Sequence, residues 1–528
     1  IHSPALGSGT PSISYGFGSS SMVSVFGRLT YNYADRYLLT YTYRRDASSN
    51  FGKDNRWAGF HAVAGSWRFS NEDFLEGFKD MVHLSNGKIR VGWGQTGNSS
   101  IGGYKWGSSI TKMPTGLGLG YRPSNVPNTA IKWETQEQYN IGLDLGFIDE
   151  RLTLVVDYYN KKSEDMLMSL QLPSYMGTRG NGSSALAAPW GNYGTIENKG
   201  VEITLGGRPV VGAFEWDSEF QISFNRNKLV ALDGQSSSAI EGYGQWSDVV
   251  SRTEVGQSLY NFYGYVCDGV YKDLADIKNS PKDVKYPEDG KSFNRATTVW
   301  VGDMKYKDLN GDGVITEKDK TNIGSPMPDF TFGFNNTFRY KGFDLNIFIN
   351  GSYGNKIYNY MAMKLTHMNS GWTNQLSDVV DRTRLEAIDP NKDYSQGVDS
   401  NGDGTVDTWH WYDDINNVKV ANNSSLPRAS IQDANDNDRV SDRSIEDGSY
   451  IRIKNVTLGY TLPKSIISKA KLDNVRIYTN IQNVATFTEY SGYDPEIGAS
   501  TASPNVMGLD NGRYPSPTVW SFGLNVTF

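Results

Sequence analysis

A strict alternation of apolar and polar side chains recurs along most of the chain. In the stretch FEWDSEFQISF, residues 214–224, the even positions apart from Ser218 are aromatic or aliphatic, and the odd positions carry carboxylates, an amide or a hydroxyl. Successive side chains of a strand point to opposite faces, so this pattern predicts a strand with one apolar and one wet face. The same pattern predicts thirteen strands, near residues 22–33, 36–46, 57–69, 88–96, 131–146, 151–163, 195–207, 214–227, 330–340, 343–353, 450–461, 475–486 and 518–528.

The connections between these strands alternate between short and long. Turns such as 34–35 and 341–342 are followed by long segments, of which 228–329 and 354–449 are the largest. Short turns on one side and long loops on the other are typical of outer-membrane barrels. We therefore predict an all-β fold, a transmembrane antiparallel β-barrel with long extracellular loops. The apolar face of 214–224 should meet lipid and its charged face the lumen.

The number of strands indicates where this sequence lies in a barrel. The last strand ends on the short-turn side, which is the periplasmic side in such barrels, and thirteen is an odd number. Closed bacterial barrels have an even number of strands. We therefore expect at least one strand before residue 22 and expect residues 1–21 to be the end of an outer loop.

Composition excludes several classes of protein. The 528 residues are 38% hydrophobic with a net charge of −7, which gives no basic surface for nucleic acid. The single cysteine, Cys267, excludes an internal disulfide and is expected to be a small buried side chain. We find no apolar run long enough for a spanning helix and no signal peptide in the first residues, which resemble the middle of a loop.

Motifs for catalysis are missing from the sequence. The five histidines form neither HExxH nor a Cys/His ligand cluster. The run GLGLG at 116–120 follows no strand-to-helix pattern, and no segment resembles a nucleophile elbow. We therefore expect no enzyme activity and no organic cofactor.

One loop has the oxygen spacing of a calcium site. In DLNGDGVITEKD, residues 308–319, side-chain oxygens recur at alternate positions and a glycine permits the sharp turn. The last position carries aspartate where such loops have glutamate. Because the aspartate side chain is shorter, the smaller ion Mg²⁺ is an alternative to Ca²⁺. The other alternative is a solvated turn that holds no metal. The expected ligands are Asp308, Asn310, Asp312, the Val314 carbonyl, Thr316 and Asp319.

A second acidic run, DSNGDGTVDTWH at 399–410, is a weaker candidate for a metal site. His410 stands where the closing carboxylate belongs, and Asp413 or Asp414 would replace it only by a different loop path. The candidate ligands are Asp399, Asn401, Asp403 and Asp407.

Aromatic residues in the long loops are candidates for contact with a ligand or a partner. Each has two explanations, because an aromatic ring stacks on sugar rings and also packs inside a loop core. The candidates are Tyr104, Trp106, Trp190, Tyr243, Trp246, Trp372, Trp409 and Trp411.

Several segments resemble the barrel of SusC-like (RagA/SusC) TonB-dependent transporters from the outer membranes of Gram-negative Bacteroidetes. They include KIRVGWGQTGN (88–98), WETQEQYNIGLDLGF (133–147), GDMKYKDLNGDGVITEKDK (302–320) and YIRIKNVTLGYTLP (450–463). The resemblance covers almost the whole chain. It implies a barrel of about 22 strands, of which this chain, 1–528, holds roughly the last thirteen, with the plug and N-terminal extension absent.

The resemblance also implies a function and partners. Such transporters import oligosaccharides or peptides without changing them covalently, are energised by TonB, and pair with a SusD-like surface lipoprotein, two such pairs forming a dimer. The terminal aromatic Phe528 resembles the signal read by the barrel-assembly machinery. A passive porin and a secreted β-rich adhesin or glycan-binding module remain the alternatives, and sugar versus peptide stays open.

Overall fold

The chain is described here by a computed structural model. It describes residues 19–169, 186–232, 239–244, 248–400, 403–498 and 505–528.

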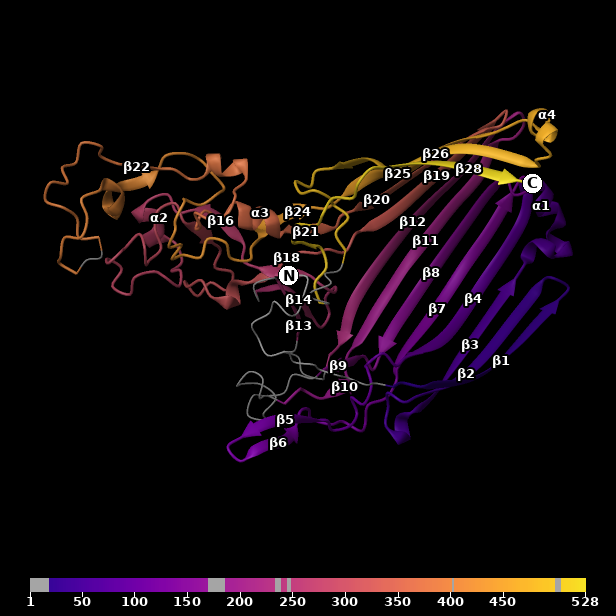
Figure 1. Cartoon of the computed structure of the whole chain (residues 1–528), viewed down its shortest axis with the longest axis horizontal. Helices are drawn as coiled ribbons and strands as arrows, with labels where there is room; N and C mark the ends of the chain where they lie inside the picture. Colours follow the sequence, from indigo (N-terminus) through magenta and orange to yellow (C-terminus); the bar gives the residue numbers. More distant parts are fainter. Residues whose placement is uncertain (1–18, 170–185, 233–238, 245–247, 401–402, 499–504) are drawn as a thin grey trace, which may run out of the picture.

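Thirteen strands form one antiparallel sheet, and its strands follow one another in chain order. The sheet is a long, curved wall of tilted strands (Figure 1). It confirms all thirteen strands predicted from the alternation. In sheet order they are β1 (Met22–Tyr33), β2 (Tyr37–Ser48), β3 (Trp57–Trp67), β4 (Leu84–Asn98), β7 (Glu134–Phe147), β8 (Leu152–Glu164), β11 (Thr195–Val210), β12 (Phe214–Ala231), β19 (Phe330–Tyr340), β20 (Phe343–Tyr353), β25 (Tyr450–Thr461), β26 (Asn474–Thr488) and β28 (Val519–Thr527).

The register of the ladder gives the wall one continuous apolar face. Leu205 of β11 pairs with Phe220, Phe220 with Phe334, Phe334 with Ile349, and Ile349 with Ile453. The rings of Phe220 and Phe334 meet edge to face with centroids 6.2 Å apart. Because the side-chain period of a strand is two, the residues between these positions form a separate, polar face.

Tight turns join the strands at one end of the wall. Ala34 and Asp35 have positive φ (52° and 54°), as do Lys341 and Gly342 (46° and 86°). Two central residues with positive φ match the right-handed twist of the flanking strands in a hairpin. The C-terminus and the helices α1 (Glu76–Val82) and α4 (Lys464–Ile467) lie at this end (Figure 1).

Long connections at the other end fold together into a lobe. The connection between β12 and β19 and that between β20 and β25 supply most of it, and the last connection, 489–518, adds a strand. One sheet contains β13 (Ala239–Tyr243), β14 (Val249–Glu254), β15 (Phe262–Gly264) and β18 (Thr321–Gly324), and another contains β24 (Ile445–Asp447), β21 (Lys356–Asn359) and β27 (Leu509–Asp510). The other lobe elements are β16 (Cys267–Val270), β17 (Met304–Tyr306), β22 (Leu385–Ala387), β23 (Val418–Val420), α2 (Leu274–Asn279) and α3 (Tyr360–Leu365).

The lobe has hydrophobic cores of the kind found in soluble domains. Phe262, Tyr358 and Val506 come from three different connections and share one buried cluster. A second cluster packs Trp300 against Val418. The connections are therefore held to one another by buried apolar surface.

Smaller outer elements follow β4 and β8. They are the hairpin of β5 (Ile110–Thr115) and β6 (Gly118–Pro123), and the pair of β9 (Leu167–Ser169) and β10 (Trp190–Asn192). A small core around Phe51, Ile131 and Trp133 packs against Leu167 of β9 and Trp190 of β10. Across the described part of the chain, the helices are all too short or too polar to cross a membrane.

Candidate functional site

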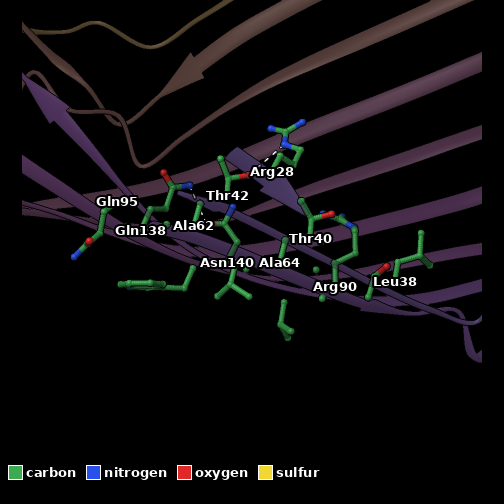
Figure 2. A pocket seen from close by; sticks show the side chains of 18 of the residues that line it. Arg28, Leu38, Thr40, Thr42, Ala62, Ala64, Arg90, Gln95, Gln138 and Asn140 are labelled. Carbon is green, nitrogen blue, oxygen red and sulfur yellow. Dashed lines mark hydrogen bonds between the residues drawn. The ribbon is translucent and has the colours of Figure 1, made fainter. Parts of the chain in front are cut away.

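The polar face of the wall carries a cavity of about 620 Å³ over β1 to β4 and β7. Figure 2 shows its lining, in which Arg28 Nε donates to Thr42 Oγ1 (3.2 Å) and Gln138 Nε2 to Asn140 Oδ1 (2.8 Å). Small residues such as Ala62 line it between these groups. The result is an open surface of hydrogen-bonding groups.

A second cavity of about 610 Å³ continues this surface over β8, β11 and β12. It shares Arg90, Gln138 and Asn140 with the first. Tyr159 donates from its hydroxyl to Asn225 Oδ1 at 2.9 Å. The two cavities form one polar strip across the wall, which we call the lumen strip.

Ion pairs lie on the same face. Arg90 Nη2 donates to Asp144 Oδ1 (2.7 Å) and to Asp157 Oδ2 (3.0 Å). Arg476 pairs in the same way with Asp344, its Nε lying 2.9 Å from Oδ1. Opposite charges are therefore paired along this face.

The loop 308–319 is wound around its own carboxylates. Asp308 accepts backbone N–H bonds from Gly311 and Gly313, both at 2.7 Å. The fully buried Asp319 accepts from Thr316 N at 2.7 Å and from Leu309 N at 3.0 Å. These hydrogen bonds form a turn of the kind that is the alternative to a metal site. They do not test the prediction of calcium, which stays a prediction.

The second acidic run has a similar local arrangement. Asp399 accepts from Gly404 N at 2.7 Å, and Asp407 accepts from Ser400 Oγ at 2.7 Å. Asp403 accepts from Thr405 N, whereas Asn401 lies outside the described residues. The metal prediction for this run also stays a prediction.

The aromatic candidates fall into two groups. Trp190 and Trp411 pack against the small cores of the outer loops, and Trp106 is half-buried beside Tyr104. Trp246 lies outside the described residues. The exposed candidates, open to a ligand or a partner, are Tyr104, Tyr243, Trp372 and Trp409.

A buried charged group in the lobe was missed by the sequence analysis. His367 Nε2 lies 2.7 Å from Asp433 Oδ2, and Nδ1 lies 2.9 Å from Asp438 Oδ2. Lys364 Nζ donates to the same Asp438 at 2.7 Å. Within the described ranges this is the one set of three metal-type side chains close enough to share an ion. Since carboxylates occupy both ring nitrogens and an ammonium group is already present, the arrangement is an ion-pair clamp.

Burial affects two titratable side chains of the lobe in different ways. Burial lowers the pKa of His367, but the hydrogen bonds to Asp433 and Asp438 outweigh it and raise the pKa to about 9. The imidazole is therefore charged at neutral pH. Burial raises the pKa of Cys267 to about 11, so its thiol is protonated at neutral pH. The side chain is half-buried, where the sequence predicted a buried one.

The lumen residues Arg90, Asp157 and Tyr159 were also missed. Their signal was present in the sequence, because the alternation assigns each of them to the polar face of its strand.

Comparison with known proteins agrees with this architecture. The family model described as "TonB dependent receptor-like, beta-barrel" matches residues 2–331. The chain belongs to this family. Together with the relatives described next, this match confirms the resemblance to SusC-like transporters, the β-barrel fold class and the outer-membrane location.

The relatives are longer than this chain. TonB-dependent receptor P3 of Formosa agariphila is 34% identical over 96% of this chain and 46% of its own length. TonB-dependent receptor SusC of Bacteroides thetaiotaomicron is 29% identical over 96% and 44%. The solved RagAB peptide transporter has the same fold, with a TM-score of 0.70 at 21% identity over 96% of this chain and 48% of that one. The chain thus spans about half the length of the curated relatives it matches.

Proposed function

We propose that this chain forms the wall and outer mouth of an active importer, which takes up oligosaccharides or peptides across the outer membrane. The observation that carries the proposal is the two-faced wall. One face is continuously apolar, as contact with lipid requires, and the other presents the lumen strip to the passage. A solute loses its hydration shell in such a passage and regains hydrogen bonds from amides and paired charges.

The proposed importer works with a SusD-like lipoprotein over the mouth, in a dimer of such pairs. Exposed aromatic rings on the outer side, including Tyr104 and the 98% exposed Trp372, support contact with a partner or a ligand. TonB would act through a part of the protein that this sequence does not contain. The substrate leaves chemically unchanged.

The proposed substrate is a glycan or a peptide. RagAB is described as a peptide transporter, and amide side chains of the lumen strip, such as Gln138 and Asn140, suit peptide groups and sugar hydroxyls alike. We therefore propose both classes and let the experiment separate them.

Uptake in the host organism tests the proposal. Cells carrying the full-length gene receive a fluorescent peptide mixture in one arm and a fluorescent oligosaccharide mixture in the other. We expect one arm to lose uptake when the gene is deleted and also when TonB is inactivated. Uptake that depends on the gene and survives loss of TonB would indicate a passive porin instead, and a protein extracted without detergent would indicate a secreted module.

We also propose a hard divalent cation, Ca²⁺ or Mg²⁺, as the ligand of the loop 308–319. The support is the spacing of its oxygen side chains and the Asp308 carboxylate held at the turn by two backbone amides. The ion would fix the outer loop that leads into β19. It takes no part in transport chemistry.

A further inference from the structure

The last outer connection joins β26 to β28. Its described parts, 489–498 and 505–518, are here named the strap. Arg452 of β25 is paired in the ladder with Asn350 on one side and Thr486 on the other. This register places Arg452 on the polar face, near the outer end of its strand.

Arg452 bonds directly to the first arm of the strap, 489–498. Its Nη1 donates to Glu496 Oε2 at 2.7 Å, and its Nη2 donates to Asp494. Asp494 Oδ2 in turn accepts from Ser516 Oγ at 2.7 Å, which lies on the returning arm. Lys454 Nζ adds a bond to Glu496 at 3.0 Å. The first arm is therefore tied to the guanidinium group of Arg452, and the returning arm is tied to the first arm through Asp494.

Burial shows on which side the strap lies. Arg452 and Asp494 are each only 2% exposed. Arg90 and Arg476, on the same face, keep about a third and a quarter of their side chains exposed. A residue on a lumen face loses its exposure only when something covers it from inside the barrel. The strap therefore lies inward of β25 and β26.

The strap is also fixed to the lobe. Leu509 and Asp510 form β27, which pairs with β21, and Val506 is buried in the core that contains Phe262. Tyr490 donates from its hydroxyl to Asp510 Oδ2 at 2.6 Å. In Figure 1 the yellow connection lies where the lobe meets the outer ends of β25 and β26. The strap thus bridges the lobe and the inside of the wall.

We propose that the strap is the constriction of the outer passage and that Arg452 is the positioning residue that keeps it inside the barrel. This inference rests on the proposed function in one respect, which is that the substrate passes through the lumen. The strap is held in place by a buried charge pair. Separating this pair would leave an unpaired charge in the interior, which costs free energy, so movement of the strap away from Arg452 is disfavoured.

Hydrogen exchange on the full-length transporter tests the positioning role. In Arg452→Met we expect exchange in the strap to become at least about tenfold faster while the wall strands stay protected. Arg476→Met is the matched control, since Arg476 is paired on the same face but with Asp344, near the tight-turn end. Glu496→Gln keeps the buried pair of Arg452 and Asp494, so hydrogen exchange in the strap should be intermediate between the parent and Arg452→Met. This variant provides the test if Arg452→Met assembles poorly. Unchanged strap exchange in both variants overturns the role of Arg452.

Thiol labelling tests the constriction. Gln482, on the polar face of β26 and further from the mouth than Arg452, is replaced by cysteine in a Cys267→Ser background. We expect N-ethylmaleimide to react equally in all variants and a large polyethylene glycol maleimide to react roughly tenfold faster in Arg452→Met than in the parent or in Arg476→Met. In Arg452→Lys the ammonium group replaces the two-armed guanidinium group and bonds to fewer partners. Its rate of labelling by the large maleimide should therefore lie between those of the parent and Arg452→Met.

Two outcomes contradict the constriction. A large reagent that reacts at the same rate with and without Arg452 shows that the strap does not narrow the path. A cysteine that neither reagent reaches in Arg452→Met shows that another part of the protein closes it. Neither measurement requires transport, so this inference and the proposed import function fail separately.

Discussion

The wall and the lobe use the same residue types in opposite ways. In the wall, large apolar side chains point out of the fold, and Leu29 is 66% exposed. In the lobe, Trp300 is completely buried with Tyr271 and Val418. The difference follows from the solvent, since hydrocarbon surrounds the wall and water surrounds the lobe.

Charges differ in the same manner. The pair of Arg90 and Asp144 on the lumen strip stays partly exposed, whereas Arg428 and Asp303 in the lobe are buried and 2.7 Å apart. Burial raises the pKa of Asp303, although Arg428 opposes the shift. The wall thus depends on its backbone ladder and on the membrane, and the lobe depends on its own core. The two regions should therefore lose structure independently.

The largest expected effect is in the lobe core. Replacing Trp300 with alanine should lower the free energy of unfolding of the lobe by about 3–5 kcal/mol, because a large cavity remains. Protease added to intact cells should then cleave within 232–329, while the barrel still shows heat-modifiable migration on gels. Loss of the folded barrel as well would mean that the two regions are one cooperative unit.

The apolar face of the wall gives the next effect. Ile222→Arg, in the middle of β12, should destabilise the inserted barrel by about 2–4 kcal/mol, whereas Gln221→Arg on the opposite face should be nearly neutral. Folding in lipid vesicles at increasing urea measures both. Equal losses in the two variants would contradict the assignment of lipid and lumen faces.

The His367 clamp predicts a pH dependence confined to the lobe. Its pKa is raised in the folded state, so its stabilisation is complete below about pH 6.5 and is lost as the pH rises through about 9. The lobe should lose roughly 3 kcal/mol over this range. His367→Gln should abolish the dependence, as followed by hydrogen exchange of lobe peptides at several pH values. A wild-type lobe equally stable at both ends of the range would contradict the clamp.

The smallest effect is expected at the loop 308–319. Calcium should slow exchange in this loop, and Asp312→Ala should remove the response while the barrel still assembles. Asp308 keeps its bonds to Gly311 and Gly313 in that variant, so the loss should be on the order of 1 kcal/mol. If calcium changes hydrogen exchange of this loop in neither the wild-type protein nor Asp312→Ala, the loop is an ordinary turn without a metal site.

Much of the wall was predictable from local sequence. The period of two placed Phe220 and Gln221 on opposite faces without any knowledge of their neighbours. The ends were less certain, since the strand expected at 88–96 extends over Leu84–Asn98. Strand ends depend on what pairs with them, and no local pattern encodes the partner.

The site was predicted less well. Exposed Trp372 and half-buried Trp411 look alike in sequence, and only packing separates a contact residue from one that packs on a core. Arg452 and Asp494 are 42 positions apart and carry no motif. A bond across that separation depends on the path of two loops.

The sequence by itself determined the strands, their order and their two faces, because a strand's alternation is fixed by backbone geometry residue by residue. Only the tertiary structure decided how the long connections pack into one lobe, which aromatic rings they bury, and that the strap lies inside the wall. Those features depend on contacts among Phe262, Tyr358 and Val506 and on the Arg452 cluster, which form only when distant segments meet.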